Sequence, residues 1–358
     1  MNAGMNPVLS RPAEMLSGRS LEGGWIVANR VQRTQQGTGG MFSVCYYVKH
    51  EDGREGFLKA LDFTDALHSD DPARCLQDLT EAFNFERDVL AVCRGQSMDR
   101  IITAISDGKV VVSEAPAGGV VQYLIFELAD GDVRSHLSRN GSATLAWRLR
   151  CLHHIATGLK QLHGVGIAHQ DVKPSNVLVF DAQKSKVGDL GRSARKGFSP
   201  PHEQFDYAGD PAYAPPERLY GFADGEWNSR RQGCDCYLLG SMIVFFFCGV
   251  SITQILFDRM APEHCWWEWN GSFEDVLPYV RQAFNEVVDE FSAQIASRVL
   301  RKEIVPLLRQ LCDPDPRVRG DNLNRGRGGN PFNMERYVTR LDVLARHAAR
   351  GDYDEVSS

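Results

Sequence analysis

Apolar and β-branched residues in the early part of the chain come in short runs separated by polar stretches. Within 25–63 the runs WIVANRV, FSVCYYV and GFLKALDF are broken by QQGTGG and EDGREG. Short apolar runs bounded by turn residues are typical of β-strands, so this pattern predicts a small antiparallel sheet. Strands are predicted again over 101–128, where VVV and YLIFEL occur.

Helical spacing of apolar residues appears between these strand regions and dominates after them. In 74–93 apolar residues recur three and four positions apart, which predicts a helix. The same period predicts helices over four later segments: 145–163, 235–250, 277–312 and 333–349. A β-rich first third followed by an α-rich remainder predicts an α+β protein of two lobes.

Composition and charge exclude several classes of protein. The formal net charge is −6 without a sustained basic block, so nucleic-acid binding by bulk charge is not expected. The most apolar window, 237–250, is shorter than the roughly 20 residues that cross a bilayer, so we expect a buried helix and no membrane partner. The nine cysteines form no CxxC pair, which favours a reducing cytoplasm over secretion.

The segment HQDVKPSN at 169–176 carries the chemistry. It combines Asp171, Lys173 and Asn176, which are a base, a cation and a metal-binding amide, in one short loop before an apolar strand. A further carboxylate, Asp189, follows in GDLG after another short strand. These groups in this order outline a phosphoryl-transfer site.

Two further motifs lie upstream, the glycine-rich GTGGMFSV at 37–44 and Lys59 in GFLKA. The order is a glycine-rich hairpin, a strand lysine, a helix glutamate, HxDxKxxN and DxG. This order resembles the signature set of the protein kinases. The chain is similar to the eukaryotic-type, or Hanks-type, serine/threonine protein kinases over about residues 25–320, and we expect a divergent bacterial or phage member.

The resemblance implies a bilobal fold with a small β-rich N-terminal lobe and a larger helical C-terminal lobe. We expect a disordered leader at 1–22, because this segment is rich in Gly, Ser and Pro and lacks the apolar core of a signal peptide. The N-terminal lobe is expected at 23–128 and the C-terminal lobe at 129–320. Residues 321–358 are expected to form a loop, one amphipathic helix and a polar tail.

The resemblance also implies ATP and Mg²⁺ as cofactors and a protein Ser/Thr hydroxyl as the acceptor. The residues implied to contact the nucleotide are Gly37, Gly39, Gly40, Val44, Lys59, Glu86, Glu127, Ala129 and Asp132. The glycine backbone amides would cover the phosphates, and Val44 would pack on the adenine. Lys59 would neutralise the α- and β-phosphates and be held by Glu86, with Glu81 as the alternative.

In the family pattern Phe126 stands at the gatekeeper position. The backbone groups of Glu127 and Ala129 would meet the adenine, and Asp132 the ribose. No sequence feature predicts the oligomeric state.

The family's catalytic roles fall on four matching residues. Asp171 would accept the proton of the substrate hydroxyl, and Lys173 would stabilise the transferring phosphoryl group. Asn176 and Asp189 would hold Mg²⁺.

Three more matches concern architecture. Glu217 in GDPAYAPPE is expected to pair with Arg317 of DPDPRVRG, with Arg319 as the fallback. Asp235 is expected to brace the backbone of the 169–176 loop.

Departures from the pattern suggest one property and two alternatives. Gln170 replaces the arginine that normally meets a phosphate on the activation segment, so we expect activity that does not require phosphorylation there. Phe42 and Phe57 add bulk at the nucleotide pocket, and Asp210 replaces a threonine, which raises the alternative of a partner-binding pseudokinase. A small-molecule phosphotransferase of the aminoglycoside type is the second alternative. Lys173, the PPE triplet and Arg317 argue against it, because the resemblance assigns them to the protein-substrate platform.

Overall fold

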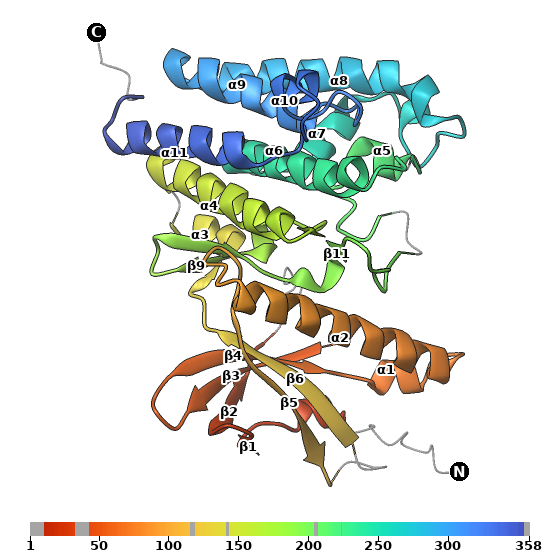
Figure 1. The fold of residues 1–358 in the computed structure, drawn as a ribbon, viewed down its shortest axis with the longest axis vertical. Coiled ribbons are helices and arrows are strands. Elements are labelled where there is room, and N and C mark those ends of the chain that lie inside the picture. Colours follow the sequence, from red (N-terminus) through yellow and green to blue (C-terminus); the bar gives the residue numbers. More distant parts are fainter. Residues whose placement is uncertain are drawn as a thin grey trace, which may run out of the picture. The chain divides into compact units, whose positions relative to one another are not determined.

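The chain forms two compact units (Figure 1), seen in a computed structural model that describes residues 11–32, 43–114, 119–140, 143–203, 207–222 and 224–353. The first unit comprises Met1–Ser97 and Ile102–Ala129, and the second comprises Met98–Ile101 and Asp130–Ser358. The division after Ala129 lies one residue beyond the predicted boundary at 128/129, whereas residues 98–101, predicted in the N-terminal lobe, belong to the second unit. Residues 37, 39, 40 and 42, to which the sequence assigned roles, lie outside the described residues.

The first unit is built on a six-stranded antiparallel sheet in the order β1-β2-β3-β4-β6-β5. Its strands are β1 (Ser20–Leu21), β2 (Trp25–Arg30), β3 (Ser43–His50), β4 (Glu55–Leu61), β5 (Ala104–Val112) and β6 (Gly119–Glu127). The short helix α1 (Thr64–Leu67) and the long helix α2 (Pro72–Gly95) follow β4, and Figure 1 shows α2 beside the sheet. Asp71 caps α2 by accepting a hydrogen bond from the backbone of Arg74 at 3.1 Å.

The segment before β1 is ordered from residue 11 onward, which corrects the expectation of a disordered leader for residues 11–22. Ala13 and Leu16 are buried in the core on one face of the sheet. The Tyr46 hydroxyl donates to the carbonyl of Ala13 at 2.7 Å, and Arg11 pairs with Asp62 at 2.9 Å. This segment contains few apolar residues, so its sequence did not indicate that Ala13 and Leu16 cover the sheet.

The second unit is mainly helical. Its helices are α3 (Val133–Asn140), α4 (Leu145–Gly164), α5 (Pro216–Leu219), α6 (Gly233–Cys248), α7 (Ile252–Arg259), α8 (Phe273–Gln294), α9 (Arg298–Cys312), α10 (Asn322–Gly326) and α11 (Glu335–Ala349). Its short strands are β7 (Gly131–Asp132), β8 (Ile167–Ala168), β9 (Val177–Phe180), β10 (Lys184–Val187) and β11 (Ala194–Arg195). The single helical segment predicted over 277–312 is two helices, because Ser297 caps a new helix by accepting from the backbone of Leu300.

Helix α6 is the centre of the second unit, as its continuous apolar sequence predicted. Nearly every side chain from Gly233 to Phe246 is buried, and the helix contacts α4 on one side and α9 on the other (Figure 1). At Gly240 a Cβ atom would collide with Cys312, so the close approach of α6 to α9 requires glycine. Within the described ranges no single helix could cross a membrane, although the bent pair Asn228–Cys248 and Ile252–Arg259 passes that test by length and composition.

Helix α11 is the amphipathic helix predicted near the end of the chain, and it lies along α4 (Figure 1). Tyr337, Leu341 and Leu344 are buried on the face toward the unit. Arg150 of α4 pairs with Asp342 of α11 at 2.6 Å. The segment beyond residue 320 is therefore part of the second unit's packing.

Candidate active site

A two-stranded hairpin places Asn176 and Asp189 at the same end of the second unit's small sheet. Strands β9 and β10 are antiparallel, with Val177 opposite Val187, so the residue before β9 and the residues after β10 lie side by side. The backbone N–H of Gly188 donates to the carbonyl of Asn176 at 2.8 Å. Asp189 follows with a φ of 59°, which turns the chain directly after the strand.

Asp235, at the start of α6, holds the loop that carries Asp171. Its carboxylate is fully buried and accepts hydrogen bonds from the backbone N–H groups of His169 and Gln170, both at 2.8 Å. His163 of α4 also bonds to this carboxylate at 2.8 Å. The prediction that Asp235 braces the loop backbone is confirmed. These hydrogen bonds fix the position of the loop backbone. Moving the backbone away would leave the buried charge of Asp235 without hydrogen-bond donors, which is energetically costly.

His169 connects the catalytic loop to the turn before Asp189. Its Nε2 lies 2.9 Å from the carbonyl oxygen of Gly188, and its Nδ1 lies 3.2 Å from the backbone nitrogen of Asp171. These contacts fit the tautomer that donates from Nε2 and accepts at Nδ1. His169 is therefore a buried histidine that packs within the loop.

Both carboxylate oxygens of Asp171 are held by neighbours. Oδ1 accepts from the backbone N–H of Asp210 at 2.9 Å, and Oδ2 accepts from the amide of Asn176 at 3.0 Å. The same Asn176 amide donates to the Asp171 carbonyl at 2.8 Å. Since this amide nitrogen is directed at Asp171, the amide oxygen of Asn176 is the atom that can coordinate a cation.

Lys173 lies between two carboxylates. Its Nζ is 3.2 Å from Oδ2 of Asp171 and 3.4 Å from Oδ2 of Asp210. Lys173 thus supplies positive charge between the carboxylates of Asp171 and Asp210, which offsets their mutual repulsion. Asp210 therefore adds a second anion around Lys173 while its backbone still orients Asp171.

The pKa of Asp171 is raised above its ordinary value of 3.8, chiefly because burial disfavours the charged form. Lys173 opposes this shift, and the nearby carboxylate of Asp189 adds to it. A raised pKa makes a carboxylate a stronger base toward a hydroxyl proton. The environment of Asp171 thus suits proton acceptance better than that of an exposed aspartate.

In the first unit, Lys59 of β4 pairs with Glu86 of α2. Nζ lies 3.1 Å from Oε1 and 2.9 Å from Oε2 of the glutamate. Glu86 is buried and shares a helix face with Phe83 and Leu90, at helical spacing. The choice of Glu86 over Glu81 is confirmed, since Glu81 makes an exposed bond to Gln77 at 2.7 Å instead.

The register of β3 against β4 corrects the expectation for Val44. Cys45 lies directly opposite Lys59, and Val44 lies opposite Ala60. Because successive side chains of a strand alternate between the faces, Val44 belongs to the buried core on the face opposite Lys59. Phe57 is on the face of Lys59, two residues before it and paired across the sheet with Phe126, as its spacing predicted.

The remaining predicted nucleotide contacts lie where β6 ends and the second unit begins. Glu127 is the last residue of β6, and its backbone N–H donates to the Thr103 carbonyl at 3.2 Å. Asp132 in β7 accepts from the backbone N–H of Ser135 at 2.7 Å, so it caps α3. The adenine contacts of Glu127 and Ala129 and the ribose contact of Asp132 stay predictions.

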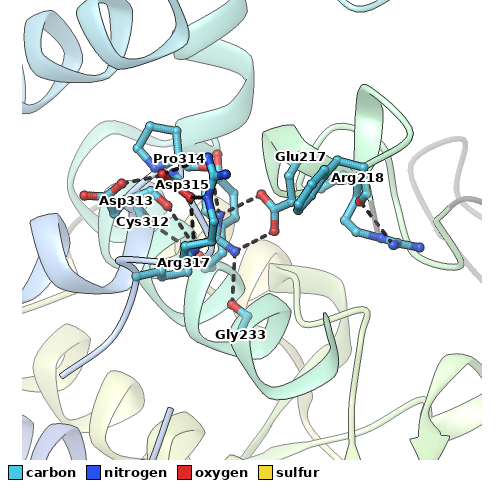
Figure 2. Close-up of polar contacts among 12 residues, drawn as sticks. Glu217, Arg218, Gly233, Cys312, Asp313, Pro314, Asp315 and Arg317 are labelled. Atoms are coloured by element: carbon cyan, nitrogen blue, oxygen red, sulfur yellow. Dashed lines mark hydrogen bonds and ion pairs between the residues drawn. The ribbon is translucent and has the colours of Figure 1, made fainter. Parts of the chain in front are cut away.

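Glu217 pairs with Arg319, and the prediction of Arg317 as its partner is wrong. Both distances from the Arg319 nitrogens Nη1 and Nη2 to the carboxylate oxygens are 2.7 Å. Figure 2 shows Glu217 facing the turn that carries Asp313, Asp315 and Arg317. Arg317 is taken by Asp315, whose carboxylate lies 2.7 Å from its Nε. The sequence DPDPRVRG contains the DPxxR spacing twice, and burial selects the second arginine.

Asn176 and Asp189, at one end of the β9–β10 hairpin, have oxygen atoms that suit magnesium coordination. Mg²⁺ prefers oxygen ligands and keeps water and phosphate oxygens in its shell, so one amide oxygen from Asn176 and one carboxylate from Asp189 are an adequate protein contribution. No group of three or more His, Cys, Asp or Glu residues could hold a metal ion in the described ranges.

The protein kinase domain family model matches residues 32–320, and the chain belongs to this family. A probable serine/threonine-protein kinase PknB of Lactococcus lactis is 26% identical over 263 residues, which cover 72% of this chain and 40% of that protein. Serine/threonine-protein kinase PknA of Mycobacterium tuberculosis is 28% identical over 205 residues, covering 57% of this chain and 43% of that protein. Serine/threonine-protein kinase PTK2 of Candida glabrata is 25% identical over 216 residues, covering 54% and 27%. The chain spans less than half the length of these relatives.

Several residues around the site were not found from sequence. Tyr207 donates from its hydroxyl to the Gln170 carbonyl at 2.9 Å, and Arg230 and Arg231 both pair with Glu203. The only available signal was the pair of adjacent arginines shortly before Asp235, together with the missing arginine at 170.

Proposed function

We propose that the chain is a serine/threonine protein kinase that transfers the γ-phosphoryl group of ATP, with Mg²⁺, to a hydroxyl of a protein substrate. One observation carries the proposal. Asp171, Lys173 and Asn176 form a single hydrogen-bonded cluster in which the base is held by two donors and the cation lies between two carboxylates. Family membership makes phosphoryl transfer the chemistry that this cluster suits.

Each residue of the cluster has a defined task in this reaction. Asp171 accepts the proton of the incoming hydroxyl as the new bond to phosphorus forms and the bond to the leaving ADP oxygen breaks. Lys173 supplies positive charge where negative charge develops on the phosphoryl oxygens. Mg²⁺, when bound with the nucleotide, neutralises the phosphates, and Asn176 and Asp189 would hold it.

Lys59 has its task in the first unit. Glu86 fixes the position of its ammonium group, which would neutralise the α- and β-phosphates of ATP. A lysine is suited to this because its compact charge needs no particular approach direction.

One argument for the pseudokinase alternative, the acidic residue at position 210, is weakened. That alternative was motivated partly by Asp210, whose backbone holds Asp171 and whose carboxylate shares Lys173. A lost threonine therefore does not mean a lost contact to the catalytic base. The small-molecule alternative is opposed by the Glu217–Arg319 pair, which belongs to the protein-substrate platform of the family resemblance.

The direct test is transfer of labelled γ-phosphate from ATP with Mg²⁺ to the protein itself and to a generic basic protein. Asp171→Asn should lower the transfer rate by about 10²- to 10⁴-fold, the range for loss of a general base. Asp189→Asn should also lower it, whereas the control Asp289→Asn, an exposed residue paired with Arg309, should not. Label on Ser or Thr supports the proposed acceptor.

An equal rate in wild type and Asp171→Asn would contradict the proposal. A silent wild type whose melting temperature does not respond to ATP and Mg²⁺ would favour the partner-binding alternative.

The raised pKa of Asp171 gives a prediction about pH. Transfer requires the ionised carboxylate, so the rate should fall as the pH is lowered through a pKa above the ordinary 3.8. Because the folded-state pKa lies above the unfolded one, stability is lost as the pH rises from about 3.8 through the folded-state pKa, and above that pKa the ionised Asp171 carries the full cost. Asp171→Asn should therefore not lower the free energy of unfolding at pH 7, as measured by urea denaturation, although it removes activity.

A further inference from the structure

The side chain of Gln170 is directed toward the N-terminal end of α6. Gln170 has a φ of 68° and is buried, and its Nε2 donates to the Arg231 carbonyl at 2.8 Å and to Asp235 at 3.2 Å. In the family resemblance an arginine at this position would meet a phosphate on the activation segment. Gln170 instead fastens the catalytic loop to the residues just before α6.

Those residues supply two arginines to Glu203, which lies in the activation segment, the part of the chain that the family resemblance places between Asp189 and Glu217. They form the short π-helix η4 (Asn228–Gln232), which leads directly into α6. Arg230 Nη2 lies 2.7 Å from Oε1 of Glu203, and Arg231 Nη2 lies 2.6 Å from Oε2. Each carboxylate oxygen thus has its own guanidinium, which is the arrangement that strengthens charge-assisted hydrogen bonds.

Arg231 links this pair to the catalytic loop. Its side chain is only 8% exposed, and its Nη1 donates to Oε1 of Gln170 at 3.4 Å. Burial lowers the pKa of Arg231, and the neighbouring charge of Arg230 lowers it further, while Glu203 opposes both effects. Two adjacent cations, one of them buried, require an anion, and Glu203 is the carboxylate that reaches both.

The activation segment touches the catalytic loop again a few residues after Glu203. Tyr207 bonds to the Gln170 carbonyl, and a Cβ atom at Gly209 would lie 2.6 Å from that same oxygen. The next residue, Asp210, donates its backbone N–H to Asp171. The contacts of 207–210 therefore set the position of the catalytic base, and Glu203 holds the segment just before them.

We propose that Glu203 is a positioning residue that takes the place of an activation-segment phosphate. Its carboxylate, held by Arg230 and Arg231, keeps Tyr207 and Asp210 in contact with the catalytic loop, so these contacts do not require a modification. We call these three residues the Glu203 clamp. The inference rests on the proposed kinase activity for its kinetic measurement, but not for its structural one.

The experiment compares wild type with Glu203→Gln, which removes the charge and keeps the shape, and Glu203→Asp, which keeps the carboxylate. Glu263→Gln, an exposed glutamate elsewhere in the second unit, is the matched control. These four proteins and Arg230→Gln are treated with phosphatase before kcat and KM are measured, and wild type is also measured without the treatment. Hydrogen exchange is followed by mass spectrometry in peptides covering 196–213, and a melting curve verifies folding.

Glu203→Gln should lower kcat by about 10-fold or more, the loss expected for a charge-assisted hydrogen-bonded pair, with KM for ATP unchanged. Exchange in 196–213 should become faster. Glu203→Asp should recover part of kcat, and Arg230→Gln should show a smaller loss of the same kind because Arg231 remains. Phosphatase treatment should leave wild-type kcat unchanged.

The proposal is overturned if Glu203→Gln keeps wild-type kcat and wild-type exchange, or if phosphatase removes the activity of the wild type. A general loss of folding would instead lower the melting temperature in both Glu203 variants without separating kcat from KM, and this too would overturn a specific positioning role. If wild type transfers no phosphate at all, the proposed function fails, and hydrogen exchange alone decides whether the Glu203 clamp orders the segment.

Discussion

The two units each contain a cation–carboxylate pair, and the pairs differ in what surrounds the cation. In the second unit Arg319 is fully buried, binds both oxygens of Glu217 and donates to the carbonyls of Asp313 and Gly233. In the first unit Lys59 is 26% exposed beside the buried Glu86. A cation whose donors are all taken by the protein has none left for a ligand. A cation that stays accessible can still bind one.

The difference distinguishes a pair that stabilises the fold from a pair that serves the proposed reaction. Arg319 lies 5.1 Å from the ring centre of Tyr237 in α6 and joins the turn after α9 to the end of the activation segment. Removing either partner would leave a buried charge without compensation. Lys59, in contrast, is paired with Glu86 and is only partly buried. We therefore expect a substitution in the Glu217–Arg319 pair to lower the free energy of unfolding. A substitution in the Lys59–Glu86 pair should mainly lower the rate of phosphoryl transfer.

The largest effect on folding is expected from Arg319→Met. It should lower the free energy of unfolding by about 3–5 kcal/mol, because Glu217 would remain buried and unpaired. Urea denaturation followed by circular dichroism measures this. The control is Arg317→Met, two residues away, whose side chain is 49% exposed and whose loss should cost at most about 1 kcal/mol. Equal losses in the two variants would break the comparison.

A smaller effect on folding, but a large one on transfer, is expected from Lys59→Met. Leaving Glu86 without its lysine should cost about 1–3 kcal/mol of unfolding free energy, less than Arg319→Met. The transfer rate should fall by about 10²- to 10³-fold, as for loss of one group that stabilises developing charge. Lys49→Met, in the neighbouring strand and paired with Glu55 at the surface, is the control. A wild-type transfer rate in Lys59→Met would refute the role of Lys59.

The smallest effect is expected at a pair that is neither buried nor catalytic. Asp342 of α11 forms ion pairs with Arg150 of α4 at 2.6 Å and with Arg346 of its own helix at 2.9 Å, and all three side chains are partly exposed. Asp342→Asn should lower the unfolding free energy by about 0.2–1 kcal/mol and leave transfer unchanged. A loss above about 3 kcal/mol in thermal or urea unfolding would place this pair with Glu217–Arg319 instead.

Much of the fold followed from local patterns. Short apolar runs bounded by turn residues predicted most strands, and apolar spacing of 3.6 residues predicted most of the long helices, including the buried α6 and the amphipathic α11. The break between α8 and α9 was missed, because both helices are amphipathic and only the cap at Ser297 separates them. The ordered segment before β1 was also missed. Its buried residues are too few and too irregularly spaced to form a pattern.

Register and close packing were not readable from sequence. The position of Val44 depends on how β3 pairs with β4, and a shift of one residue exchanges the two faces of a strand. The same limit applies to Arg317 and Arg319, which both fit the DPxxR spacing. Only the turn after α9 decides which guanidinium enters the buried site.

The sequence by itself determined the family, the two-lobed α+β architecture and the identity of the central cluster of Asp171, Lys173, Asn176 and Asp189. These depend on residue types at fixed short spacings, which the linear order preserves. The tertiary structure alone decided the partner of Glu217, the cation shared by Asp171 and Asp210, and the Glu203 clamp. Each of these joins residues far apart along the chain, where the outcome depends on which charges are buried together, and burial is a property of the packed chain.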